Sequence, residues 1–169
     1  MSIKIGVLEI ITRNKSATLL DLQDSKFVST QTLGFWCNLI KYTKLHNKLI
    51  DLTHLNFKDY SSFNKKDKMR NYQKVEIAYS LFHTIRNRAF HFENLFKTNT
   101  NGTPRLSTCL LFGKNENFSF GIETHKIEKC LDNILDCFDT ETSGYISGTT
   151  KCSAMILVKQ ITERNNEIF

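Results

Sequence analysis

Two side chains that together could act on a phosphodiester, Arg86 and His91, lie five positions apart in the middle of the sequence. A guanidinium stays charged and binds phosphate through two parallel hydrogen bonds. An imidazole titrates near neutrality and can move a proton. On a helix, at about 100° per residue, Arg86 and His91 lie about 140° apart, and Asn87 lies between them in angle. These residues predict a site that binds an anion and transfers a proton.

The same segment predicts a helix face made of uncharged hydrogen-bonding groups. An ordinary solvated helix face carries Lys and Glu, whereas this one has neither, which favours a site or a contact surface. The alternative is a row of polar side chains that hydrogen-bond to one another where two helices pack together. His83 shares the face with His91 and is a second candidate for proton transfer, although a buried or solvated histidine is the commoner explanation. The residues of this polar face recur at steps of three and four: Ser80, His83, Thr84, Asn87, His91 and Asn94.

The motif Arg86-Asn87-x-x-x-His91 resembles the Arg-x(4–6)-His signature of HEPN domains, which are α-helical domains of RNA-cleaving toxins and antiviral systems. Residues 85–93, Ile-Arg-Asn-Arg-Ala-Phe-His-Phe-Glu, are similar to the Abi-like (abortive infection) branch, where an acidic residue follows the helix. Residues 33–39 are similar to the helix that precedes it there. The resemblance covers residues 30–138. One toxin branch has a Tyr two positions after the His, and Glu93 takes that place here.

The resemblance implies a metal-independent endoribonuclease of a toxin–antitoxin or abortive-infection antiviral system that cleaves single-stranded RNA. His91 would deprotonate the ribose 2′-hydroxyl or protonate the leaving 5′-oxygen. Arg86 would stabilise the charge on the phosphorane, and Asn87 would orient His91 or the phosphate. His83 and Glu93 are supporting candidates. A homodimer would place both motifs in one groove, and an antitoxin protein is a further expected partner.

A basic segment precedes the motif helix, in a chain with a net charge of +6 and a pI near 9.1. With Tyr60, Phe63 and Tyr72 interleaved, this segment could follow an RNA backbone and stack bases. The alternative is a solvated loop without a partner. Arg88 is a further candidate for RNA binding, although a surface charge or a dimer contact also explains it. The basic residues of the segment are Lys65, Lys66, Lys68 and Arg70.

The apolar pattern predicts the elements that must position these side chains. Residues 71–96 form the clearest helix, about 39 Å long, with apolar residues at steps of three and four. Helices are also expected at 30–52 and 123–138, and residues 2–22 fit a helix or a strand. Residues 106–112 and 118–122 fit a short hairpin or two turns. We expect a single, mainly α domain over residues 1–169, an HEPN-like helical bundle with its core at 30–138.

Composition narrows the remaining possibilities. The 169 residues include 13 Phe, enough for one domain with a sizeable core. Five cysteines without a Cys-x-x-Cys pair, and no signal-like or membrane-spanning stretch, predict a cytoplasmic protein with no membrane association. His83 and His91 are too far apart to share a metal with Glu93, and no phosphate-binding loop is present, so we expect no metal and no cofactor. Two alternatives are a non-catalytic helical module that binds RNA or protein, and a structural dimerisation domain.

Overall fold

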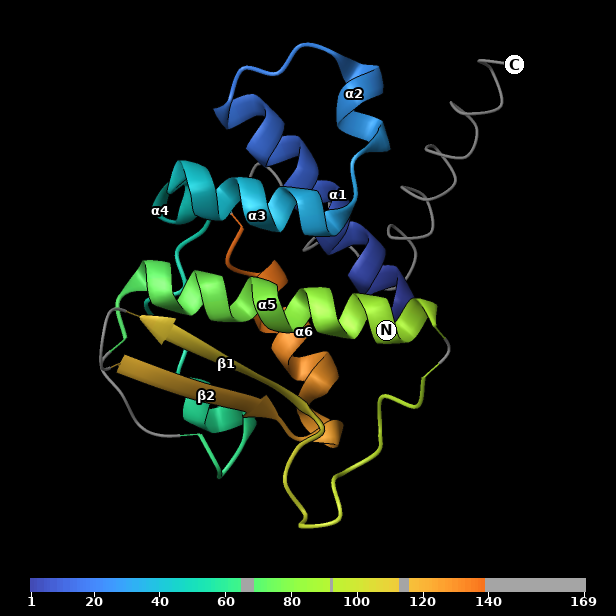
Figure 1. Ribbon diagram of the computed structural model, residues 1–169, viewed down its shortest axis with the longest axis vertical. Helices are drawn as coiled ribbons and strands as arrows, with labels where there is room; N and C mark the ends of the chain where they lie inside the picture. The colour runs from blue at the N-terminus through green and yellow to red at the C-terminus, as the bar shows by residue number, and fades with distance from the viewer. Residues whose placement is uncertain (65–68, 92, 113–115, 139–169) are drawn as a thin grey trace.

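The computed structural model describes residues 1–64, 69–91, 93–112 and 116–138, which form helices around one antiparallel hairpin (Figure 1). The expected mainly helical architecture is confirmed for these residues, and so is the hairpin, which the sequence left open. The ambiguous N-terminal segment is a helix. The elements are α1 (Ser2–Leu19), α2 (Ser25–Thr30), α3 (Leu33–Thr43), α4 (His46–Leu49), η1 (Phe57–Tyr60), α5 (Asn71–Phe90), β1 (Leu106–Phe112), β2 (Glu116–Ile122), η2 (Thr124–Lys126) and α6 (Ile127–Leu135).

Helix α5 crosses the middle of the molecule, with α3 and α4 on one side and the hairpin on the other (Figure 1). Its buried face carries Val75, Ile77, Leu81, Phe82 and Ile85, each at most 2% exposed. Part of this apolar face, including Leu81, Phe82 and Ile85, lies against residues of β2 and α6. None of the described helices combines the length and the apolar character needed to cross a bilayer.

The end of α5 corrects the predicted helix of residues 71–96. The helix stops at Phe90, and the backbone N–H of Glu93 donates to the carbonyl of Arg88 at 2.9 Å. This closure, in which the chain bonds back over six residues, is a Schellman-type helix end. The predicted apolar face therefore does not continue beyond the helix: Phe96 is 60% exposed.

The predicted helix of residues 30–52 is also wrong in extent. Thr32 caps the start of α3 by accepting a hydrogen bond from the Phe35 N–H at 3.3 Å. Lys44 then adopts a left-handed conformation, with φ 56°, and the Leu45 N–H donates to the Ile40 carbonyl at 3.1 Å. This turn separates α3 from α4. The predicted helix of residues 123–138 is shorter as well, since η2 precedes α6.

One buried amide links the hairpin to the short helix η1. Strands β1 and β2 pair antiparallel, with Leu106 opposite Ile122 and Phe112 opposite Glu116. Asn64 donates from Nδ2 to the carbonyls of Phe57 and Gly121 at 2.8 and 2.9 Å, and its Oδ1 accepts from the Gly121 N–H at 2.8 Å. The amide thus joins η1 to β2.

Replacing Glu123 with Gln is expected to reduce stability at neutral pH but not in acid. The Glu123 carboxylate accepts from the Ser62 N–H at 2.9 Å and pairs with Lys126 at 3.0 Å, and these contacts hold its pKa below the ordinary value of about 4.5. A lowered pKa in the folded state stabilises the protein fully above the unfolded pKa, and this contribution is lost as pH falls through the folded value. Urea unfolding at pH 6 and pH 3 measures it. A difference between the two proteins that is the same at both pH values would contradict the assignment.

Candidate active site

The last turn of α5 and its C-cap carry Arg86, Asn87 and His91. The helix ends at Phe90, and the His91 N–H donates to the Asn87 carbonyl at 3.0 Å. His91 is exposed, while Arg86 and Asn87 are half-buried. Along the helix axis Arg86 and His91 are about 7.5 Å apart. The predicted triad therefore lies on one helix end, with its imidazole open to solvent.

The Arg86 guanidinium is fixed from two directions. Its Nε lies 3.3 Å from the Glu9 carboxylate of α1, and its plane covers the Phe90 ring at 4.4 Å from the ring centroid. Arg13 lies 3.6 Å from the other oxygen of Glu9. Two guanidiniums thus share one carboxylate, which leaves one positive charge uncompensated among these three groups. The Arg86 side chain remains 27% exposed.

Asn87 is hydrogen-bonded to the second histidine of the polar face. Its Nδ2 lies 3.2 Å from His83 Nε2. This hydrogen bond joins two side chains one helical turn apart on α5. Gly34 of α3 approaches closely, since a Cβ at this position would stand 3.1 Å from His83 Nε2. The His83 ring thus contacts both Gly34 of α3 and the Asn87 side chain.

The polar face divides into a covered half and an open half. Ser80 shares a hydrogen bond of 2.7 Å with Thr108 of β1, and the Thr84 hydroxyl donates to the Ser80 carbonyl at 3.0 Å. The Ser80–Thr108 bond joins α5 to a strand and the Thr84 bond lies within α5, whereas the alternative interpretation placed such bonds between packed helices. Asn94 lies beyond the helix, where its Oδ1 accepts from the Phe96 N–H at 2.8 Å, so its predicted place on the face is wrong.

Arg88 and Glu93 contact each other and the segment before β1. The Arg88 Nε lies 3.8 Å from the Glu93 carboxylate, and its Nη1 donates to the Arg105 carbonyl at 3.3 Å. Arg105 reaches the same carboxylate at 3.7 Å. These contacts hold the chain after α5 against the start of β1.

Of the predicted RNA-binding segment, the structure describes Arg70, which lies far from the triad along α5. Arg70 is exposed and caps the N-terminal end of the helix, where its N–H donates to Gln73 Oε1 at 2.9 Å. Arg70 is sixteen positions before Arg86, which corresponds to about 24 Å along the helix axis. The remaining predicted cations, Lys65, Lys66 and Lys68, lie outside the described residues.

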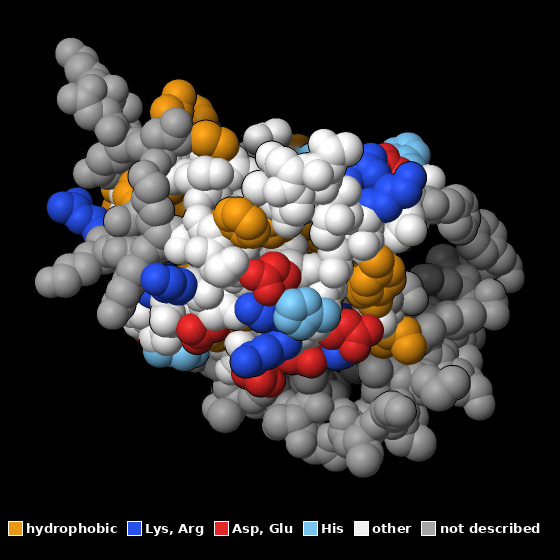
Figure 2. Space-filling view, turned by 90° about the horizontal axis from the view of Figure 1, so that it is seen from below, with side chains coloured by type: hydrophobic (Ala, Val, Ile, Leu, Met, Phe, Trp, Pro, Cys, Tyr) orange, Lys and Arg blue, Asp and Glu red, His pale blue; other side chains and the backbone are white. Residues whose placement is uncertain are grey.

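The aromatic residues predicted to stack bases differ in their exposure. Phe63 is 58% exposed, but Tyr60 is only 1% exposed, so the prediction for Tyr60 is wrong. Burial raises the Tyr60 pKa to about 12, and its hydroxyl accepts from Asn133 Nδ2 at 2.8 Å. On the face shown in Figure 2, Lys and Arg side chains lie beside Asp and Glu side chains and do not form a separate basic patch.

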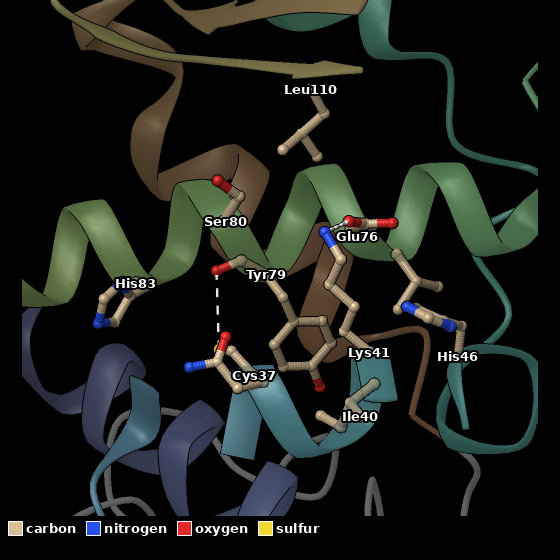
Figure 3. A pocket seen from close by; sticks show the side chains of 11 residues that line it. Cys37, Ile40, Lys41, His46, Glu76, Tyr79, Ser80, His83 and Leu110 are labelled. Carbon is tan, nitrogen blue, oxygen red and sulfur yellow. Dashed lines mark hydrogen bonds and ion pairs between the residues drawn. The ribbon is translucent and has the colours of Figure 1, made fainter. Parts of the chain in front are cut away.

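A cavity of about 190 Å³ opens beside the covered half of the polar face, between α3, α5 and β1 (Figure 3). No pattern in the sequence predicts this cavity. Cys37 lines it, but its thiol is no nucleophile, since burial and the charge of Glu9 raise its pKa to about 12. On the rim, Lys41 pairs with Glu76 at 2.5 Å.

The described residues contain no group of three or more His, Cys, Asp or Glu side chains placed to hold a metal ion. Their geometry defines a mainly α protein with a two-stranded sheet and an Arg–Asn–His triad at the end of its central helix. No protein-family model, curated protein or solved structure matches the chain.

Proposed function

We propose that the protein is a metal-independent endoribonuclease of the Abi-like branch of HEPN domains, acting in the cytoplasm within a toxin–antitoxin or abortive-infection system. The observation that carries the proposal is the end of α5. There Arg86 is fixed by Glu9 and Phe90, and His91 stands exposed on the same helix end. A guanidinium held in place and an accessible imidazole on the same helix end suit cleavage of a phosphodiester.

In this mechanism His91 removes the proton from a ribose 2′-hydroxyl, and the 2′-oxygen attacks the adjacent phosphorus. Arg86 stabilises the negative charge that builds up on the phosphorane oxygens. The bond from phosphorus to the 5′-oxygen breaks, and the leaving oxygen takes up a proton. The products are a 2′,3′-cyclic phosphate and a 5′-hydroxyl end. In a homodimer the His91 of a second copy supplies that proton, so that one imidazole acts as base and the other as acid.

Incubation of the protein with single-stranded RNA in EDTA, followed by analysis of the fragment ends, tests the proposal. We expect cleavage that EDTA does not suppress, with cyclic phosphate ends. DNA of the same sequence should stay intact because it lacks the 2′-hydroxyl. Cleavage that disappears in EDTA, or that also occurs on DNA, would remove the proposal.

A non-catalytic RNA-binding module is the second candidate, and the specific observation in its favour is that Glu9 already pairs with Arg86. Such a module would bind RNA without cutting it, and its affinity would fall as salt rises. A filter-binding titration at two salt concentrations, with the RNA recovered intact, would favour this candidate over the nuclease.

A further inference from the structure

The cavity beside the covered half of the polar face has the size of one small ring. Its volume is about 190 Å³, whereas a protein cavity of about 150 Å³ takes up benzene. A single six-membered ring with its substituents therefore fills this space, whereas a fused two-ring purine would extend out through its open side. The cavity lies between α3 and α5, under Leu110 of β1 (Figure 3).

The cavity is lined by apolar side chains and by side chains that can donate or accept hydrogen bonds. Ile40, Val75 and Leu110 supply apolar walls. The Asn38 amide both donates and accepts, and the Ser80 hydroxyl, which shares one hydrogen bond with Thr108, can make a further one to an aromatic base edge.

The charged rim adds a donor and an acceptor to this lining. The Glu76 carboxylate can accept from an exocyclic amine such as N4 of cytosine, and the Lys41 ammonium can donate to a base carbonyl. His46, also in the lining, has its pKa lowered by burial and so favours the uncharged ring. Because Lys41 is paired with Glu76, the cavity offers no unpaired lysine that would favour a phosphate over a base.

The position of the cavity along α5 connects it to the triad. His83 lines the cavity and is hydrogen-bonded to Asn87. From His83 to His91 the helix rises about 12 Å. Stacked nucleotides of one strand advance about 3.4 Å each, so a base in the cavity lies within a few nucleotides of a phosphate at His91.

We propose that this cavity is a base subsite that binds one pyrimidine of the RNA strand, within a few nucleotides of the phosphate cleaved at His91. As part of RNA cleavage the subsite rests on the function proposed above, whereas base binding can be measured without cleavage. The fragments of the EDTA reaction would then carry a pyrimidine at one fixed position near the cut.

Amide NMR titrations with cytidine, uridine, adenosine and guanosine 3′-monophosphates test base binding on the intact protein. Because all four probes carry the same phosphate, differences between them report on the base. We expect the signals of Asn38, Ser80 and His83 to shift with the two pyrimidines, at affinities at least tenfold above those of the purines. Equal shifts with all four nucleotides, or shifts confined to Arg86 and His91, would overturn the subsite.

Asn38→Tyr places a ring at the mouth of the cavity, since Asn38 is exposed on α3 and lines the cavity. We expect this variant to lose the pyrimidine-dependent shifts, while the matched control Asn14→Tyr, at an exposed position of α1, keeps them. Pyrimidine binding that persists in Asn38→Tyr would overturn the subsite. The wild-type titration decides the question even where this variant fails to fold. Pyrimidine binding without RNA cleavage would contradict the proposed nuclease function and support the base subsite. RNA cleavage without any preference for a base would support the nuclease function and contradict the subsite.

Discussion

Replacing His91 with Ala is expected to lower the rate of RNA cleavage by about 10²–10⁴-fold, the range that a general acid–base group contributes. The side chain is exposed and lies at the C-cap of α5. A surface substitution of this kind changes stability by about 0.5 kcal/mol or less, so the loss should appear in the cleavage rate and not in the unfolding curve. Single-turnover cleavage of a labelled RNA measures it.

His125→Ala is the matched control for this prediction, because its imidazole is 71% exposed and lies in η2, outside the motif helix. It should cleave RNA at the wild-type rate. Arg86→Ala should also abolish cleavage, while leaving Glu9 paired only with Arg13. Full activity in His91→Ala would exclude His91 as the group that transfers the proton.

Replacing Asn64 with Leu is expected to lower the free energy of unfolding by about 3 kcal/mol, at about 1 kcal/mol for each of three hydrogen bonds. The Asn64 side chain is 4% exposed. Its loss would leave the Gly121 N–H and the carbonyls of Phe57 and Gly121 without this buried partner. Urea unfolding followed by circular dichroism measures the change.

The control for this substitution is Asn14→Leu, which makes the same exchange at an exposed position of α1. Its unfolding free energy should stay within about 0.5 kcal/mol of the wild-type value. If both variants lost the same stability, the effect would belong to the leucine and not to the amide that joins η1 to β2.

The helical elements were predictable where apolar residues recur over several turns, as they do from Val75 to Ile85. The helix ends were not. Lys44 adopts the left-handed conformation that is usually found at Gly. Its residue type therefore gave no indication that α3 ends there and that α4 begins shortly after it. The end of α5 depends on a backbone hydrogen bond from Glu93 to Arg88, which side-chain patterns do not encode.

The candidate site shows the same division between local and distant information. The spacing of Arg86, Asn87 and His91 placed them on one helix, because helical geometry relates residues a few positions apart. Glu9 is 77 positions from Arg86 in the sequence, and no periodicity connects them. The cavity was equally hidden, because its walls come from α3, α5 and β1, which meet only in the folded chain.

The contact between Glu9 and Arg86 means that the motif cannot be transferred to another protein on its helix alone. A graft of residues 71–91 onto a foreign scaffold would carry the arginine, the amide and the imidazole, but would leave behind the acid that steadies the guanidinium. In such a chimera only the Phe90 ring would still hold the guanidinium. Any chemistry at this helix end would therefore depend on α1 as well as α5, and the six-residue motif describes only the part of the site that α5 supplies.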